Sequence, residues 1–318
     1  MKRKTVVLLA ALLMFCFLAG CGVSAPQPSA AANEKLSIVT TTFPQYDYAR
    51  QIAGEYADIT MLLPPGSESH SYEPTPQDIL KIQNCDIFIY IGGESDTWVD
   101  QVLESMDTSA IQVITLMDCA DLVEEEIVEG MENAQVQGHV EETEYDEHIW
   151  TSPINAVRMA EKIALAMINA DPDNGNAYRA NADAYIAALD ELDQSFRQIT
   201  NSAARNTLVF GDRFPFRYFA DAYSLTYYAA FPGCSTEAEP SAATVAFLMD
   251  KVKAEGIPVV FYIEFSNGKM ANTIAEATGA KKLLLHSCHN VTKAEFESGA
   301  TYIGLMRQNA ENLKEALN

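Results

Sequence analysis

Two histidines stand in proline-rich turns whose residue types suit metal binding. His70 lies in the segment 64–76, Pro-Pro-Gly-Ser-Glu-Ser-His-Ser-Tyr-Glu-Pro-Thr-Pro, and His148 lies in 146–153, Asp-Glu-His-Ile-Trp-Thr-Ser-Pro. Each turn separates a strand-like run from a helix-like run, and such a turn can hold an imidazole rigidly at a domain surface. Imidazole is the commonest protein ligand for transition metals. Because the chain has only five histidines, two in this setting indicate a metal site.

The second half of the chain supplies further donors at comparable places. Asp212 follows the strand-like run 207–210, and His286 follows the run 282–285. In an open parallel sheet, ligands bind beyond the carboxyl ends of the strands. We therefore expect these two side chains to meet the two histidines described above in a four-ligand site. Three imidazoles and a carboxylate suit zinc, whereas a more oxygen-rich set would suit manganese.

Alternatives remain open within this predicted ligand set. His289 lies three residues beyond His286 and could ligate in its place. Asp212 could instead cap a helix or pair with Arg213. Glu264, at the end of another strand-like run, could hydrogen-bond a ligand imidazole from outside the metal's own shell, or simply pair with a lysine.

Apolar runs rich in β-forming residues alternate with helix-like segments along both halves of the chain. The expected strands are 36–40, 59–63, 86–91 and 111–116 in the first half, and 207–210, 225–231, 258–263 and 282–285 in the second. The expected helices include 75–84, 241–255, 269–278 and 296–317. This alternation predicts an α/β fold with two (β/α)4-type lobes, each built on a parallel sheet covered on both faces.

A long amphipathic helix is predicted between the two lobes. Its apolar residues recur at alternating spacings of four and three, which places them on one helix face. They are Tyr178, Ala182, Tyr185, Leu189, Leu192, Phe196 and Ile199. A helix over 176–201 would span about 39 Å at ~1.5 Å per residue. A coiled coil is the alternative, but a helix packed across both lobes explains the pattern better.

The amino terminus has the pattern of an export signal. A positive tip, Lys2-Arg3-Lys4, precedes an apolar stretch over 5–17, which is too short to span a membrane. The following Leu-Ala-Gly-Cys sequence, 18–21, resembles a bacterial lipobox, which implies cleavage before Cys21 and acylation of that residue. Ordinary cleavage with a free Cys21 is the alternative. Residues 22–34 lack a core pattern and are typical of a flexible tether.

The chain thus divides into five predicted segments. They are a signal peptide (1–20), a lipid-anchored tether (21–34), an N-terminal α/β lobe (35–172), a linking helix (173–203) and a C-terminal α/β lobe (204–318). Within the first lobe, the segment 121–147 holds eleven acidic residues and no lysine or arginine. Such a segment favours a mobile loop, either a weak collector of cations or simply a solvated loop.

The overall charge narrows the range of partners. The chain carries 44 acidic and 21 basic residues, for a net charge of -23. This charge disfavours binding to nucleic acid or to anionic lipid headgroups. We therefore expect contact with the membrane through the lipid anchor only.

Four cysteines remain beyond the anchor region, at positions 85, 119, 234 and 288. An even number in an oxidising compartment favours disulfides. Cys234 and Cys288 each follow a predicted strand of the second half, so we expect this pair to form a disulfide. Thiolate ligation of a metal is the alternative.

Several motifs together resemble one known family. They are Pro-Gly-x-x-x-His-x-Tyr-Glu-Pro-Thr-Pro at 65–76, Asp-x-His-x-Trp-x-x-Pro at 146–153, Glu-Pro-Ser at 239–241, Thr-Tyr at 301–302 and Met-Arg-Gln-Asn at 306–309. The chain resembles, over essentially its whole mature length, the metal-binding lipoproteins that serve as solute-binding subunits of bacterial zinc and manganese ABC importers (cluster A-I). This resemblance implies two lobes bridged by one rigid helix, one metal in the cleft between them, and small lobe movement on binding.

The resemblance also implies a function. It implies a monomeric, non-enzymatic lipoprotein, anchored outside the cytoplasm, that captures Zn(II) and delivers it to an ABC importer permease. A manganese-binding importer subunit and a metal-dependent adhesion or surface lipoprotein are alternatives. A zinc hydrolase is less well supported, because the sequence has neither a His-Glu-x-x-His motif nor a nucleophile elbow.

The third ligand position departs from the family's pattern. The family usually has His or Glu there, but 210–219 reads Phe-Gly-Asp-Arg-Phe-Pro-Phe-Arg-Tyr-Phe. Alignment on Tyr218-Phe219 puts Arg213 in the ligand slot, and alignment on the strand puts Gly211 or Asp212 there. An arginine cannot ligate because it stays protonated. A three-histidine set without Asp212 therefore remains an alternative.

Overall fold

The computed structural model of this chain describes residues 35–131, 144–235 and 240–318. The predicted signal peptide, Cys21 and tether lie outside the described residues, as do residues 132–143 of the acidic segment. Leu36–Asn318 form one compact unit. Both predicted lobes belong to this unit.

Two four-stranded sheets organise the compact unit, and every strand pair in them is parallel. The first has the order β2-β1-β3-β4 and the second β6-β5-β7-β8. The strands are β1 (Leu36–Thr40), β2 (Ala57–Met61), β3 (Ile87–Tyr90), β4 (Gln112–Thr115), β5 (Thr207–Phe214), β6 (Thr226–Pro232), β7 (Val259–Tyr262) and β8 (Lys281–Leu284). This arrangement confirms the predicted α/β fold with two parallel sheets.

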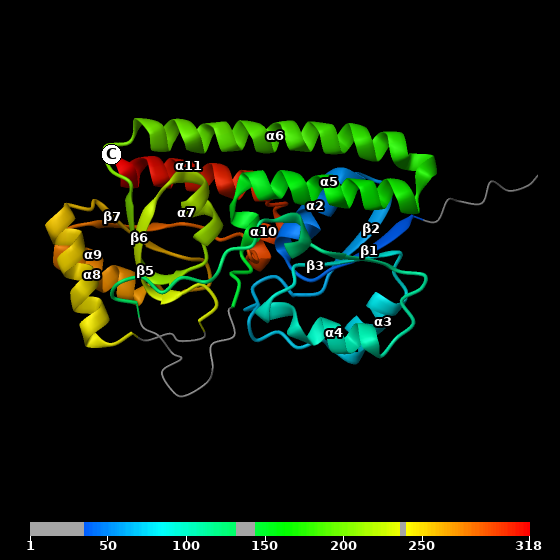
Figure 1. The fold of residues 1–318 in the computed structure, drawn as a ribbon, viewed down its shortest axis with the longest axis horizontal. Helices are drawn as coiled ribbons and strands as arrows, with labels where there is room; N and C mark the ends of the chain where they lie inside the picture. Colours follow the sequence, from blue (N-terminus) through cyan, green and yellow to red (C-terminus); the bar gives the residue numbers. More distant parts are fainter. Residues whose placement is uncertain (1–34, 132–143, 236–239) are drawn as a thin grey trace, which may run out of the picture. The chain divides into compact units, whose positions relative to one another are not determined.

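Helices connect the strands in both halves (Figure 1). Those of the first half are α2 (Phe43–Ala53), α3 (Pro76–Gln83), α4 (Thr97–Glu104) and α5 (Pro153–Ala170). The long α6 (Gly175–Ser202) is followed by α7 (Arg217–Tyr223), α8 (Ala242–Glu255), α9 (Lys269–Thr278), α10 (Lys293–Glu297) and α11 (Tyr302–Leu317). Short 3-10 turns include η1 (Glu94–Asp96), η2 (Met117–Cys119), η3 (Ile149–Thr151) and η4 (Pro172–Asn174).

Helix α6 links the two halves through a shared apolar core. It runs beside α5 and α11 (Figure 1). Its predicted apolar stripe is buried from Tyr178 to Phe196, and only Ile199 at its end is partly exposed. The same core cluster contains Ile38 of β1 and Phe210 of β5. The two sheets and α6 therefore share one continuous interior.

Local sequence signals set the ends of two other helices. Thr75 caps α3 in a reciprocal capping box with Asp78, and such caps typically contribute about 1 kcal/mol. The single helix expected over 296–317 is instead split into α10 and α11. Gly299 between them has a φ of +78°, a conformation that glycine adopts without steric cost. Thr301 then caps α11 by accepting from the backbone N–H of Gly304.

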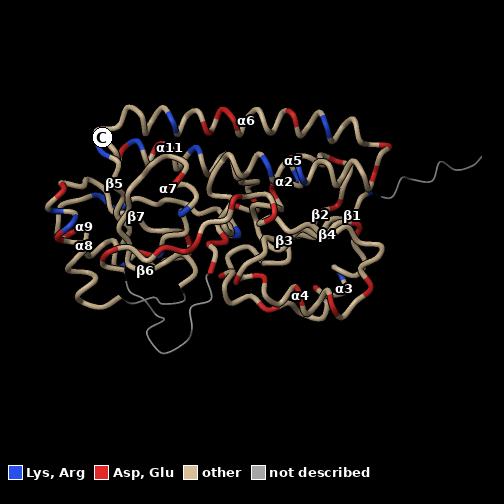
Figure 2. The backbone as a smooth tube through the Cα atoms, viewed as in Figure 1, with Lys and Arg blue, Asp and Glu red and all other residues tan. Residues whose placement is uncertain are grey.

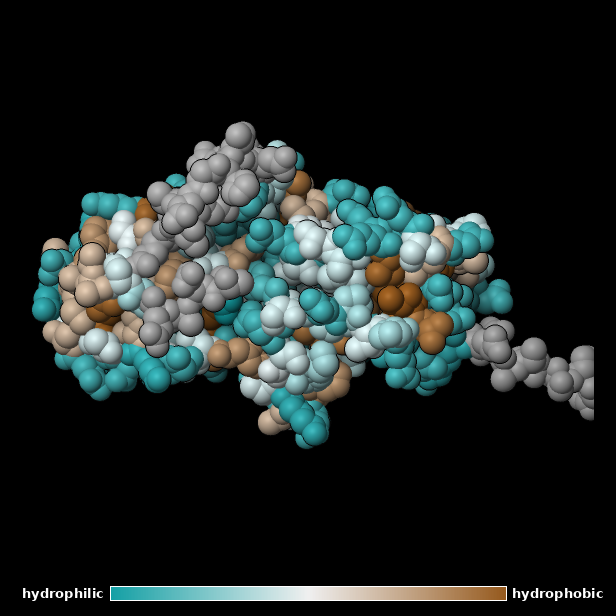
Figure 3. Space-filling model, turned by 90° about the horizontal axis from the view of Figure 1, so that it is seen from below, coloured by the Kyte–Doolittle hydropathy of each residue, from teal (hydrophilic) through white to brown (hydrophobic). Residues whose placement is uncertain are grey.

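The surface is predominantly polar and acidic. In Figure 2, acidic residues lie on most elements and outnumber the lysines and arginines. The face in Figure 3 is mostly hydrophilic and carries small apolar patches. Over the described ranges, none of the helices combines the length and apolar character needed to cross a bilayer.

The predicted disulfide between Cys234 and Cys288 is absent among the described residues. Cys85, Cys119, Cys234 and Cys288 are free thiols, so the structure does not form the expected Cys234–Cys288 disulfide. The two thiols have different surroundings. Cys288 is fully buried near the tyrosines 48, 185 and 302, whereas Cys234 lies near acidic residues and its backbone N–H donates to Glu125.

Candidate metal centre

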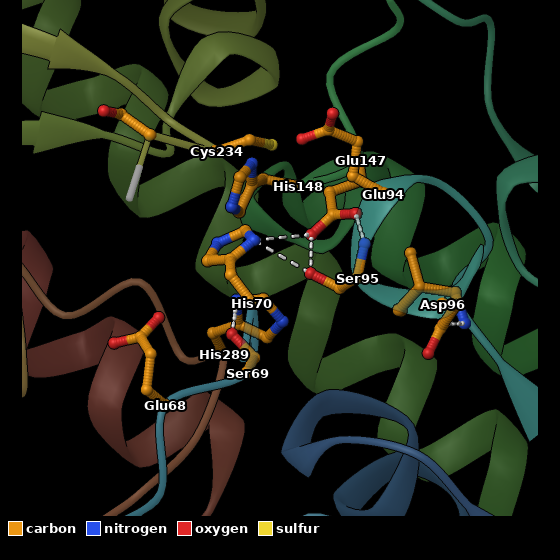
Figure 4. A network of polar contacts seen from close by, with 12 residues as sticks. Glu68, Ser69, His70, Glu94, Ser95, Asp96, Glu147, His148, Cys234 and His289 are labelled. Atoms are coloured by element: carbon orange, nitrogen blue, oxygen red, sulfur yellow. Dashed lines mark hydrogen bonds and ion pairs between the residues drawn. The ribbon is translucent and has the colours of Figure 1, made fainter. Parts of the chain in front are cut away.

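Four donor side chains converge where loops of both halves meet. One ligand atom each from His70, Glu147, His148 and His289 lies within 4.8 Å of the other three. The ring centroids of the histidines are separated by 5.9 Å (70 and 148), 5.4 Å (70 and 289) and 5.6 Å (148 and 289). Figure 4 shows the three rings grouped, with Glu147 beside His70 and His148. Three imidazoles and a carboxylate are a donor set that suits zinc.

Each donor lies on a loop beyond the carboxyl end of a strand. His70 follows β2, and His289 follows β8. Glu147 and His148 come after β4 and directly precede the turn η3. The parallel sheets therefore place donors from both halves at one location, as expected for open α/β sheets.

Hydrogen bonds fix the orientation of the imidazoles of His148 and His289. Asp146 Oδ1 lies 3.0 Å from Nδ1 of His148 and also accepts from its backbone N–H at 2.8 Å. Ser69 Oγ lies 3.0 Å from Nδ1 of His289. Because Nδ1 is engaged in this way, Nε2 is the nitrogen left for a metal ion. Such outer contacts typically contribute about 10- to 100-fold to metal affinity.

Ser95 connects His70 to Glu147. Its backbone N–H donates to Glu147 Oε2 at 2.9 Å, and its hydroxyl donates to Glu147 Oε1. The same hydroxyl oxygen lies 3.0 Å from Nδ1 of His70, and it can accept a hydrogen bond from the N–H at that nitrogen. Ser95 therefore orients two of the four donor side chains at once (Figure 4).

Two glycines allow the backbone to approach the donors closely. A Cβ atom at Gly93 would lie 2.7 Å from Cβ of Glu147, and one at Gly233 would lie 3.0 Å from Cε1 of His148. Real Cβ atoms essentially never make the first contact, so any side chain at position 93 would displace Glu147. These glycines help to define the shape of the centre.

Burial and nearby charges set the protonation of the three donor histidines. Burial, with the positive charges of His148 and Arg213, lowers the pKa of His70 to about 4. Burial also lowers the pKa of His289 well below its usual value. Burial opposes charge on His148 too, but Asp146 and Glu147 outweigh it and raise the pKa of His148. His70 and His289 are therefore neutral near pH 7, the form that binds a metal.

The structure places His286 outside this group. The ring is buried, and its Nδ1 accepts from the backbone N–H of Cys288 at 2.9 Å. The side-chain amide of Asn309 makes two hydrogen bonds to the backbone of His286. Its Oδ1 accepts from the N–H of His286 at 2.8 Å, and its Nδ2 donates to the carbonyl of His286 at 2.7 Å. Within the described residues, Nε2 of His286 has no hydrogen-bond partner. His289, the alternative to His286, is the histidine that joins His70 and His148.

Asp212 also lies outside the group. Its carboxylate accepts from the backbone N–H of Arg213 at 2.9 Å and of Ile263 at 3.4 Å. Glu264, which we expected to hydrogen-bond a ligand imidazole, has another role, because it accepts from the N–H and hydroxyl of Ser287 and lies 3.6 Å from Nδ1 of His286. Glu264 thus holds the loop that leads to His289 rather than a ligand ring.

Sequence reasoning missed Glu147 as a donor. It directly precedes His148, and in the sequence it is one of the eleven acidic residues of the segment 121–147. Its burial distinguishes it, since it is 1% exposed. The adjacent apolar Ile149 and Trp150 could have signalled this burial. Nothing in the sequence around Ser69 and Ser95 marks them as partners of ligands.

The donors and the fold define a class: a solute-binding protein whose solute is a metal ion, presented between two α/β halves. Residues 38–316 match the family model described as the periplasmic component A of a zinc-uptake complex, ZnuA. The chain belongs to this family. It is accordingly a binding component of transport, not an enzyme.

Individual relatives agree with this membership. The chain is 33% identical over 308 residues to the high-affinity zinc uptake system protein ZnuA of Bacillus subtilis, covering 95% of each chain. It is also 33% identical over 313 residues to the zinc-binding lipoprotein AdcA of Streptococcus pneumoniae, covering 98% of this chain and 61% of that longer protein. The solved Zn(II)-bound ZnuA-like domain of AdcA is similar with a TM-score of 0.73 at 31% identity, covering 89% of this chain and 99% of that one.

Proposed function

We propose that this protein captures Zn(II) outside the cytoplasm, and that His70, His148, His289 and Glu147 are its ligands. The observation that carries the proposal is the convergence of these four donors within 4.8 Å of one another. The zinc-bound relative supports the same cargo.

The donor chemistry favours zinc over manganese. Three of the four donors are imidazole nitrogens, whereas Mn(II) prefers carboxylate, carbonyl and water oxygens. Glu147 supplies one negative charge, so the loaded centre would carry a net charge of about +1 with all imidazoles neutral. Asp146 adds a further carboxylate behind His148 and stabilises that charge.

The proposal extends to delivery and attachment. The zinc is passed to the permease of an ABC importer, in line with the family's place in an uptake complex. The chain acts as a monomer held to the outer face of the cell membrane by acylated Cys21. In this scheme 1–20 is the signal peptide, 21–34 the tether, 35–172 and 204–318 the lobes, and 173–203 the linking helix.

Elemental analysis and competitive titration test the cargo. The purified protein is stripped with a chelator and titrated with zinc and manganese in competition with a chelating dye. One zinc ion bound far more tightly than manganese is the expected result. Preference for manganese would overturn the zinc assignment, and no tight binding of either metal would overturn the proposed function.

The role of the ligands is tested by substitution. His70→Ala should lower zinc affinity by orders of magnitude, because it removes one of four donors without touching the core. The circular dichroism spectrum and the unfolding midpoint of the stripped protein serve as controls for folding. Unchanged zinc affinity in this variant would reject the assigned site.

A further inference from the structure

An ion pair joins the two halves beside the candidate metal centre. Arg213, near the end of β5, donates from Nη1 to Glu68 Oε1 at 3.3 Å and from Nη2 to Glu68 Oε2 at 3.2 Å. Glu68 lies two residues before His70 on the loop after β2. Nη1 of Arg213 also donates to the carbonyl of Ser235 at 3.2 Å. The two-point contact fixes the guanidinium and carboxylate groups in one relative orientation.

This pair stands on the boundary between two cavities. A cavity of about 20 Å³ adjoins the ligands and includes His70, His148 and His289 in its lining. A larger one of about 590 Å³ reaches the surface along Asn267 and Lys269. The residues common to both linings are Glu68, His70, Arg213 and Phe265. The larger cavity is thus a vestibule that borders the metal centre at the Glu68–Arg213 pair.

The ligands themselves are well covered. Glu147 and His148 are each 1% exposed, and His289 is 7% exposed. Of the four ligand residues, His70 is the one that also lines the vestibule. Figure 4 shows the carboxylate of Glu68 directed away from Ser95 and Glu147. An ion arriving through the vestibule would therefore meet Glu68 and His70 before the other ligands.

The backbone at this boundary is strained. Phe265 has a φ of +60° and is 39% exposed. A bulky residue in the left-handed region costs on the order of 1 to 3 kcal/mol, and such strain gathers at binding sites and switching elements. Its position on both cavity linings places this strain where the vestibule meets the centre.

We propose that Glu68 and Arg213 form a gate between the vestibule and the metal centre, which controls how fast zinc enters and leaves. This proposal rests on the proposed zinc-binding function. With the pair closed, the guanidinium covers the approach to His70 and presents positive charge to an incoming cation. When the pair opens, the Glu68 carboxylate is free to attract the cation toward His70, and Arg213 turns aside.

The gate makes distinct predictions for its two members. Arg213→Gln removes the positive charge and releases Glu68, so zinc association and dissociation should both accelerate, by about tenfold for one lost charge-assisted pair. The dissociation constant should stay within about threefold, since the four ligands are intact. Glu68→Gln also opens the pair and accelerates dissociation, but it leaves Arg213 unneutralised, so association should not accelerate. The double variant lacks both charges, so its dissociation should be as fast as in Arg213→Gln, and its association should lie between that of Arg213→Gln and that of the wild type, because the effects of contacting residues do not add.

Stopped-flow measurements test this proposal. Association is followed by mixing stripped protein with zinc, and dissociation by mixing the zinc-loaded protein with excess chelator. Arg307→Gln on α11, whose side chain is 62% exposed, removes the same charge at a distant position and is the matched control. Unfolding midpoints of all variants establish that they are folded.

The outcomes separate the two proposals. Parallel acceleration of both rates in Arg213→Gln, with Arg307→Gln unchanged, supports the gate. Rates equal to those of the wild type in both gate variants overturn the gate alone. In Arg213→Gln, a zinc affinity weakened only by faster release also overturns the gate, because that result means the pair supports ligand geometry. A wild-type protein that binds no zinc overturns the proposed function together with the gate.

Discussion

The side-chain amide of Asn290 donates a hydrogen bond to the carbonyl oxygen of Ser67 at 2.9 Å. It donates a second to the carbonyl of Pro64 at 2.8 Å. Asn290 directly follows His289, and Ser67 lies three residues before His70. One amide therefore ties together the loops that bring ligands from the two halves.

Replacing this amide should destabilise the protein and weaken the site. Asn290 is 1% exposed. Asn290→Ala leaves the Ser67 carbonyl without a donor and removes one of the two donors to the Pro64 carbonyl, which keeps the backbone N–H of Ser67 at 3.1 Å, at a cost of about 2 kcal/mol. Zinc affinity should fall by about tenfold, because the two loops are then held less firmly relative to each other. Denaturant unfolding and zinc titration measure the two effects.

A matched control lies on α11. The amide of Asn312 donates to the carbonyl of Leu284 at 2.8 Å, away from the ligands. Asn312→Ala should reduce stability but leave zinc affinity within about threefold. Equal losses of affinity in both variants would contradict a specific role for Asn290.

Substitutions of His286 and His289 should differ in their effect on zinc affinity. His289→Ala removes a ligand and should lower zinc affinity by several orders of magnitude. His286→Gln should change affinity by less than about tenfold, because the His286 ring is hydrogen-bonded to the backbone of Cys288, though stability should fall by about 1 kcal/mol or more. Competitive zinc titration of the two variants measures both affinities. A larger loss of affinity in His286→Gln than in His289→Ala would exclude the assigned ligand set.

Asp146 should contribute more to zinc affinity than Asp212 does. Asp146→Asn removes the carboxylate that holds Nδ1 of His148 at 3.0 Å and should weaken zinc binding by about 10- to 100-fold. Asp212→Asn changes a carboxylate outside the ligand group and should leave affinity within about threefold. A large loss in the Asp212 variant, measured by the same titration, would show that Asp212 contributes to the centre.

The buried carboxyl of Asp96 should make stability depend on pH. Burial and the nearby charge of Glu147 raise the pKa of Asp96 to about 7. A group with a raised pKa in the folded state holds its proton better when folded. Its contribution to stability is therefore present below about pH 4 and is lost as pH rises toward 7.

Asp96→Asn isolates this contribution. The amide oxygen can still accept from the backbone of Ile91 and Gly92, which Asp96 contacts at 2.8 Å and 3.2 Å. The wild type should lose stability relative to the variant between about pH 4 and about pH 7, measured by denaturant unfolding of the stripped proteins. A constant difference across this range would show that Asp96 does not titrate there.

We expect that the acidic segment can be shortened without loss of the centre. The backbone N–H of Glu125 donates to the carbonyl of Glu144 at 2.9 Å, so the two ends of the segment lie together. Replacing 127–142 by two glycines should keep zinc affinity within about threefold, because all four ligands lie outside the deletion. A large loss of affinity in zinc titration would indicate that the segment supplies a ligand.

Periodic patterns made much of the fold predictable. The stripe from Tyr178 to Phe196 determined the long helix because its spacing matches one helix face. The strands were located within a few residues because buried parallel strands are continuous apolar runs. The extension of β5 to Phe214 was not predictable, since its pairing shifts register between Phe210 and Arg213.

The centre was predictable only in part. His70 and His148 stand in recognisable turns, but the choice between His286 and His289 depends on how the loop after β8 folds. Cys288 has a φ of +63°, which redirects the backbone between the two histidines. A left-handed cysteine is rare and leaves no mark in the sequence, so only the folded loop reveals which ring joins the other donors.

The continuous interior shared by both sheets and α6 has a consequence for how the two halves evolve. Ile38 and Phe210 belong to one apolar cluster although they come from different halves. A half exchanged for that of a distant relative would meet an unmatched surface along α6 and the opposite sheet. We therefore expect the two halves to evolve as a single module, in which a change of metal preference arises by substitution within loops rather than by recombination of lobes.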